Sequence, residues 1–274
     1  MGPPSSSALA QAVVSWAERI ARARSLAASP SPASNILTFY ANLTEYQRNI
    51  RVPSRAPSLN FVDALNVDAA AGEVQNFIIW LERHGPPPLA KGVSDLRGIG
   101  SLLWKELMVE RLVEGAIVSG DDTAAFVVDA VLQPFAEDAA QGCRDAGGGG
   151  TADLTSRRCP TCGGRPVVGA LREEGQGTRR VLICALCGTE WPYLRVRCAA
   201  CEEDRFDALP VYTAAVAAHV RIDACDTCHI YMKTVDQSRE GEAVPVADDL
   251  ATVPLDLWAR DRGYQRLYPN LLRL

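Results

Sequence analysis

The sequence predicts an α+β multidomain protein, in which an all-helical N-terminal domain precedes two tandem rubredoxin-like (zinc-ribbon-like) metal-binding subdomains of four cysteines each. Three observations lead to this fold class. Apolar residues in the N-terminal half recur every three or four positions, which is the period of amphipathic helices. Four consecutive glycines at 147–150 then interrupt the chain. After them come short β-rich runs and four Cys-x-x-Cys pairs.

The N-terminal half divides into amphipathic helices separated by prolines and glycines. The apolar periodicity predicts helices over 8–28, 34–50, 60–71, 73–83 and 99–115. A last helix begins after Asp121 or Asp122, since either side chain can cap it, and runs to about residue 140. Gly85 and the three prolines after it mark a helix end. The large aromatic side chains on these helices are predicted to pack in the core rather than to line a pocket.

The changes of pattern set the predicted domain boundaries. The helical domain covers 1–146, a Gly-rich linker 147–156, the first ribbon 157–196, and the second ribbon with a C-terminal helix and tail 197–274. In the ribbons we expect hairpins of 167–171 with 179–183 and of 206–212 with 220–224, and further strands over 191–197 and 231–235. Asp248 and Asp249 are predicted to cap a final helix over 249–262.

The cysteine spacing indicates two closed metal sites. The gaps between successive pairs are 21, 10 and 23 residues, so that two long gaps flank one short gap. This spacing favours a tandem duplication, in which each ribbon holds one tetrahedral site. The predicted ligands of the first site are Cys159, Cys162, Cys184 and Cys187, and those of the second are Cys198, Cys201, Cys225 and Cys228.

The residues around the pairs are also suited to metal binding. Two residues between cysteines make a tight turn whose backbone N–H groups point at the sulfurs. Gly163 and Gly188 follow the second cysteine of their pairs, where a positive φ is expected, whereas Glu202 and His229 occupy these positions in the second ribbon. His219, His229 and the unpaired Cys143 are not predicted as ligands. Ribbons this small need a bound metal to fold.

Composition and motifs exclude several classes of function. The net charge is −5, and each site of four thiolates with a divalent ion would add −2, so the chain has no general attraction for nucleic acid. No apolar run is long enough for a membrane span. Glu18 and Arg19 interrupt any signal-peptide core, so paired thiols in a cytoplasmic chain favour metal over disulfides. No catalytic triad, phosphate loop or dinucleotide motif is present, which predicts that the protein is not an enzyme.

The cysteine pairs and their flanks resemble the formate dehydrogenase accessory protein family, FdhE, over about 159–265. The similar segments are Cys159-Pro160-Thr161-Cys162-Gly163, Cys184-Ala185-Leu186-Cys187-Gly188-Thr189-Glu190-Trp191, Arg195-Val196-Arg197-Cys198-Ala199-Ala200-Cys201-Glu202, Cys225-Asp226-Thr227-Cys228, Tyr231-Met232-Lys233 and Val246-Ala247-Asp248-Asp249-Leu250-Ala251, followed by Leu255-Asp256 and Gly263-Tyr264. In the helical half, Leu132-Gln133-Pro134-Phe135-Ala136-Glu137 is a family-like segment.

The resemblance implies a cytoplasmic maturation factor. Such proteins bind the catalytic subunit of respiratory molybdenum formate dehydrogenase before its export, and they carry rubredoxin-type iron. Iron at two sites is therefore favoured, and zinc is the alternative because both metals accept tetrahedral thiolates. Two other functions are weighed: a rubredoxin-type electron carrier and a zinc-ribbon nucleic-acid-binding protein. The cysteine-rich half of the chain, residues 151–274, has no basic excess to support the latter. Homo-oligomerisation is left open.

Overall fold

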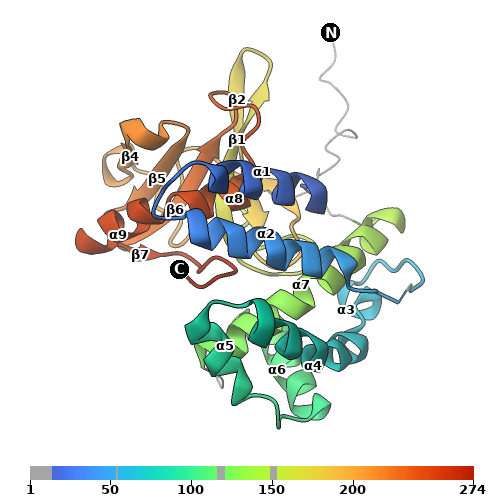
Figure 1. Cartoon of the computed structure of the whole chain (residues 1–274). Helices are drawn as coiled ribbons and strands as arrows, with labels where there is room; N and C mark the ends of the chain where they lie inside the picture. The colour runs from blue at the N-terminus through green and yellow to red at the C-terminus, as the bar shows by residue number, and fades with distance from the viewer. Residues whose placement is uncertain (1–13, 54, 116–120, 149–152) are drawn as a thin grey trace.

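The computed structural model describes residues 14–53, 55–115, 121–148 and 153–274, and it confirms the α+β fold class (Figure 1). Helices α3 to α6 gather at one end of the molecule and the sheet lies at the other, with α1, α2 and α7 between them. The helices of this half are α1 (Trp16–Ala28), α2 (Ser34–Asn49), α3 (Phe61–Ala64), α4 (Val67–His84), α5 (Pro87–Ser94), α6 (Ser101–Glu114) and α7 (Asp122–Asp145).

Most of the predicted helices agree with these elements, but the helix predicted over 60–71 is wrong: the chain leaves the helical conformation at residues 65–66, and residues 67–71 form the first part of α4. Polar side chains cap several of the helices. Ser15 and Glu18 form a capping box at the start of α1, where the Ser15 Oγ accepts the N–H of Glu18 at 3.2 Å. Asp121 caps α7 by accepting the N–H of Ala124 at 2.8 Å, as predicted. The beginning of the helix predicted over 8–28 falls on residues 1–13, which lie outside the described residues. Among the helices of the described chain, none has the length and apolar character that a membrane crossing requires.

Helix α5 is an element that the sequence analysis missed. The prolines after Gly85 end α4 as predicted, but Pro87 then opens a new helix of 8 residues. A proline is tolerated in the first helical turn because its missing N–H would have no intrahelical acceptor there. Three prolines in a row can therefore separate two helices without an intervening loop.

One mixed sheet joins both cysteine ribbons. Its main strands are β1 (Pro166–Glu174), β2 (Gly177–Cys184), β3 (Glu190–Pro192), β4 (Val211–Thr213), β5 (Val220–Cys225) and β6 (Ile230–Asp236), in the order β3-β2-β1-β6-β5-β4, and β7 (Gln265–Arg266) pairs with β6. The β1–β2 and β5–β6 hairpins are antiparallel, and β1 lies parallel to β6 between them. The sheet thus crosses the predicted boundary at residues 196 and 197. The domain limits stay a prediction, and residues 149–152 of the linker lie outside the described chain.

Two predicted strands are shorter than expected. The segment over 206–212 begins as a single 3-10 turn, Phe206–Ala208, and only Val211–Thr213 pairs with β5. Pro210 precedes this strand and has no N–H to donate to a ladder. The strand predicted over 191–197 ends at Pro192.

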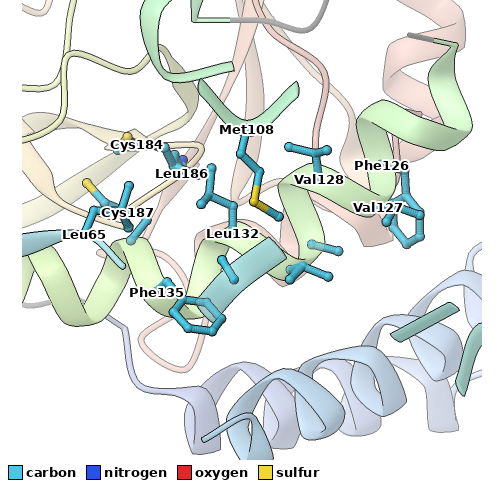
Figure 2. Packing of buried hydrophobic residues seen from close by; sticks show 14 of the residues in the cluster. Leu65, Met108, Phe126, Val127, Val128, Leu132, Phe135, Cys184, Leu186 and Cys187 are labelled. Atoms are coloured by element: carbon cyan, nitrogen blue, oxygen red, sulfur yellow. Dashed lines mark hydrogen bonds between the residues drawn. The ribbon is translucent and has the colours of Figure 1, made fainter. Parts of the chain in front are cut away.

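The main hydrophobic core runs from the helical half into the first ribbon. Figure 2 shows Leu186 and Cys187 of the ribbon beside Leu132 of α7 and Met108 of α6. All four side chains are buried in one cluster. The glycine segment is therefore not the sole connection between the two halves, because burial of this shared apolar surface also holds them together.

The prediction that Asp248 and Asp249 cap a helix over 249–262 is wrong. Helix α8 (Pro245–Ala251) begins before the acidic pair, and α9 (Val253–Asp261) follows as a separate helix. Pro254 separates them, because it lacks an N–H and its ring would clash with a continuing helix. Asp248 instead lies beside α1, where it pairs with Arg22 at 2.7 Å and with His219 at 2.8 Å.

Asp249 belongs to a buried charge network that sequence reasoning did not foresee. Its Oδ1 lies 2.6 Å from Arg266 and 3.1 Å from the Lys233 Nζ, and Lys233 also contacts Asp256 at 2.6 Å. Burial acts to raise the pKa of Asp249, but the charges of Arg266 and Lys233 outweigh burial and hold that pKa below its usual range. The network joins α8 and α9 to strands β6 and β7.

Candidate metal centres

The first cysteine group lies where the ends of the β1–β2 hairpin meet. Cys159 and Cys162 occupy the turn before β1, whereas Cys184 ends β2 and Cys187 follows it. Their four sulfurs all lie within 4.8 Å of one another. The Sγ atoms of Cys159 and Cys187 are 3.6 Å apart, and those of Cys162 and Cys184 are 3.4 Å apart. The group could hold one metal ion.

The second group repeats this arrangement in the other ribbon. Cys198 and Cys201 precede β4, Cys225 ends β5, and Cys228 lies in the turn between β5 and β6. These four sulfurs also lie within 4.8 Å of one another. The Cys198–Cys228 and Cys201–Cys225 Sγ distances are both 3.7 Å. The structure thus brings the cysteines together in the sequential pairs that the spacing indicates, although a ligand role for each stays a prediction.

The sulfur distances fit a tetrahedral metal ion. A metal–sulfur bond of about 2.3 Å gives a tetrahedron with edges of about 3.8 Å, close to the four distances above. A Cβ at Gly164 would lie 3.1 Å from the sulfurs of Cys162 and Cys184, so a larger residue there would press on both sulfurs. Soft thiolates in this geometry suit iron and zinc alike.

The backbone conformation supports the same conclusion. The residue after the second cysteine has a positive φ in all four turns: 71° at Gly163, 65° at Gly188, 68° at Glu202 and 55° at His229. Each turn repeats this geometry even where the residue is not glycine. Backbone N–H groups also point at the sulfurs, with Gly164 donating to Cys162 at 3.4 Å and Ala200 to Cys198 at 3.3 Å. Such bonds stabilise thiolates.

The thiols influence one another's protonation. Hydrogen bonds from Cys162, Cys184 and Cys187 hold the pKa of Cys159 well below its usual range. Burial raises the pKa values of Cys184 and Cys187 well above the usual range of a thiol. A second thiolate in this buried group would lose its hydration and would lie beside the thiolate of Cys159. A divalent cation at the centre would remove this repulsion and allow all four sulfurs to ionise.

Comparisons with known proteins agree with these centres. The model of the FdhE central domain matches residues 158–195, and that of the FdhE C-terminal domain matches 196–273. Relatives named "Protein FdhE homolog" include one from Aquifex aeolicus, which is 27% identical over 88% of this chain and 89% of its own length. Those from Pseudomonas aeruginosa and Edwardsiella ictaluri are 37% and 33% identical, and their alignments cover 45% and 59% of this chain but only 42% and 52% of the relatives.

Over residues 158–273 the chain is similar to the FdhE family. Members of this family are accessory proteins of formate dehydrogenase maturation. The crystal structure of the FdhE protein from Pseudomonas aeruginosa has a similar fold, with a TM-score of 0.73 and 24% identity, covering 96% of this chain and 98% of that chain. An electron carrier and a nucleic-acid-binding protein are not favoured by these findings.

The histidines and the unpaired cysteine of the described chain lie away from the sulfurs of the two groups. His219 bonds Asp248, and the exposed His229 ring lies 6.2 Å from the ring of Tyr264. Cys143 is buried in the helical core, and burial raises the pKa of its thiol. None of these three belongs to a candidate metal group among the described residues. The structure gives Cys143 the small apolar role expected at a helix end.

Proposed function

We propose that this protein is a cytoplasmic accessory factor that binds the catalytic subunit of a molybdenum formate dehydrogenase before its export and is needed for its maturation. Its two four-cysteine centres maintain the shape of the surface to which the immature subunit binds. The protein has no catalytic activity of its own. Similarity to the FdhE family models over residues 158–273, together with two intact four-cysteine groups on one sheet, carries this proposal. Four protein ligands leave no open coordination position for a substrate or a water molecule.

The proposed metal is iron in both centres. Iron held by four thiolates can change between ferrous and ferric states, whereas zinc cannot, so iron would also allow a redox-dependent interaction. The residues that would hold it are the four cysteines of each group, with the backbone N–H groups of Gly164 and Ala200 tuning two of the sulfurs.

Metal analysis of anaerobically purified protein tests this assignment. We expect about two iron ions per chain and a visible absorption band that a reductant bleaches reversibly. The band arises from charge transfer between thiolate and ferric iron, which zinc does not show. Stoichiometric zinc with no visible absorption would contradict iron but not metal binding.

Co-purification with the catalytic subunit tests the accessory function. We expect this chain to co-purify with the catalytic subunit of formate dehydrogenase when that subunit lacks its cofactor. We expect Cys198→Ser to weaken this complex because the second ribbon loses its shape. Cys143→Ser is the matched control, since it removes a buried thiol outside both groups. Undiminished binding and maturation with Cys198→Ser would overturn a metal-dependent role.

A further inference from the structure

The two cysteine groups have different surroundings. Cys159, Cys184 and Cys187 are 3%, 2% and 0% exposed, and all three belong to the main hydrophobic core shared with the helices. In the second group Cys201 is exposed and Cys228 is half-buried. None of the second group's cysteines belongs to a hydrophobic cluster of the described residues. An apolar shell restricts solvent access to a metal site. The shell of the first group is the more complete, although Cys162 is half-buried there and Cys198 and Cys225 of the second group are buried.

Solvent can also approach the second group from within the fold. Cys198 and Cys225 line a cavity of about 80 Å³. Beside the first group, Cys184 borders a smaller cavity of about 40 Å³. Water can therefore reach the second group along this cavity, and a chelator or a competing thiol can reach it at the exposed Cys201.

The turns of the second group are more strained. Glu202 and His229 hold a left-handed conformation, with φ of 68° and 55°, at positions where the first group has glycine. A residue with a Cβ rarely adopts this conformation because the Cβ approaches the following carbonyl oxygen. When the metal leaves, these two residues can relax to an ordinary φ, whereas Gly163 and Gly188 gain no such relief.

We propose that the two centres differ in metal exchange: the first retains its ion, and the second gives its ion up to a competing chelator while the helices and the shared core stay folded. As the divalent ion leaves, the four thiolates take protons from water, so the step needs no oxidant or reductant. This inference rests on the proposed metal binding at both groups.

Exchange at the second centre would alter the neighbouring surface. Val196 and Phe206 lie on either side of the Cys198–Cys201 turn and are 45% and 82% exposed. The bound metal holds this turn against the β5–β6 turn, so its loss releases the segment that carries both apolar side chains. Occupancy of the second centre therefore sets the shape of one exposed face.

Timed chelation with mass spectrometry tests the proposal. The full chain, loaded with two metal equivalents, is mixed with excess EDTA, and samples are alkylated with N-ethylmaleimide and digested. We expect the second group's four cysteines to become alkylated at least about ten-fold faster than the first group's. One metal equivalent should be released in that phase, and the far-ultraviolet circular dichroism should keep its helical signal.

Reciprocal glycine variants separate turn strain from accessibility. His229→Gly removes the strain at the second centre and should slow its metal release by several-fold. It is a cleaner change than Glu202→Gly, which would also remove ion pairs with Arg157 and Arg197. Gly163→Ala introduces the strain at the first centre, where the added Cβ would meet nothing within 4 Å, and it should speed release there.

The outcomes are distinguishable. Equal alkylation rates for the two groups, or earlier alkylation of the first, would overturn the proposed difference while leaving metal binding intact. A chain that takes up no metal would overturn both. Unchanged release rates in His229→Gly and Gly163→Ala would refute the contribution of turn strain and leave the exposed Cys201 to account for any difference in rate.

Discussion

Cys187→Ser is expected to unfold the junction between the helices and the sheet. Cys187 is fully buried beside Leu65 and Leu132 in the core that both halves share (Figure 2). Metal binding at structural thiolate sites contributes roughly 10–16 kcal/mol, which is comparable with the whole stability of a typical domain, about 5–15 kcal/mol. Weakening the first site should therefore lower the free energy of unfolding by on the order of 5 kcal/mol or more, measured by thermal and urea denaturation of the metal-loaded protein.

Two matched variants make this result specific. Cys143→Ser also places a hydroxyl in the helical core but leaves both cysteine groups complete, and it should cost only about 1–3 kcal/mol. Cys201→Ser removes an exposed sulfur of the second group and should leave the cooperative unfolding of the helices in place. If Cys187→Ser unfolds at the same temperature as Cys143→Ser, the first site contributes nothing to the junction.

Lys233→Met is expected to destabilise the fold by about 3–5 kcal/mol, which is typical for breaking a buried ion pair. The Lys233 side chain is 0% exposed, and its Nζ contacts Asp249, Asp256 and the hydroxyl of Thr252. Methionine fills much of the same volume but leaves two buried carboxylates with only Arg266 to balance them. Chemical denaturation, monitored by circular dichroism, measures the change.

The control for this variant is Lys105→Met. Lys105 pairs with Asp68 at the surface, where both side chains are largely exposed, so its removal should cost at most about 1 kcal/mol. The double variant Lys233→Met with Asp256→Asn should recover part of the loss, because it also removes one of the unbalanced charges. Equal destabilisation by Lys233→Met and Lys105→Met would show that the network adds no stability.

Local patterns in the sequence were sufficient for much of the fold and of the site. The three- and four-residue apolar period locates α2, α4, α6 and α7 because each helix buries one face. The cysteine spacing indicates the two groups because each hairpin returns the chain to its starting end. Glycine after the second cysteine marks the positive φ of the first ribbon's turns. These features depend on residues close in sequence or joined by one hairpin.

Other features depend on contacts between distant segments and left no local signal. The sequence contains Lys233, Asp249 and Asp256 but gives no sign that they are buried together, since isolated charges are usually exposed. Their burial follows from the packing of α8 and α9 on β6 and β7. The misassigned acidic pair has the same cause: a carboxylate at a helix start suits capping locally, and only the packed fold shows its long-range partners.

The sequence by itself determined the fold class, the two sets of four cysteines and the resemblance to the FdhE family, because these are encoded in periodicity and spacing. Only the tertiary structure decided that one sheet runs through both ribbons and that the two groups are unequal. β1 and β6 pair across more than 60 residues, and a parallel pairing of this kind follows from the global fold rather than from a turn. Packing against α6 and α7 buries the first group. The second group has no such cover at Cys201, which is exposed.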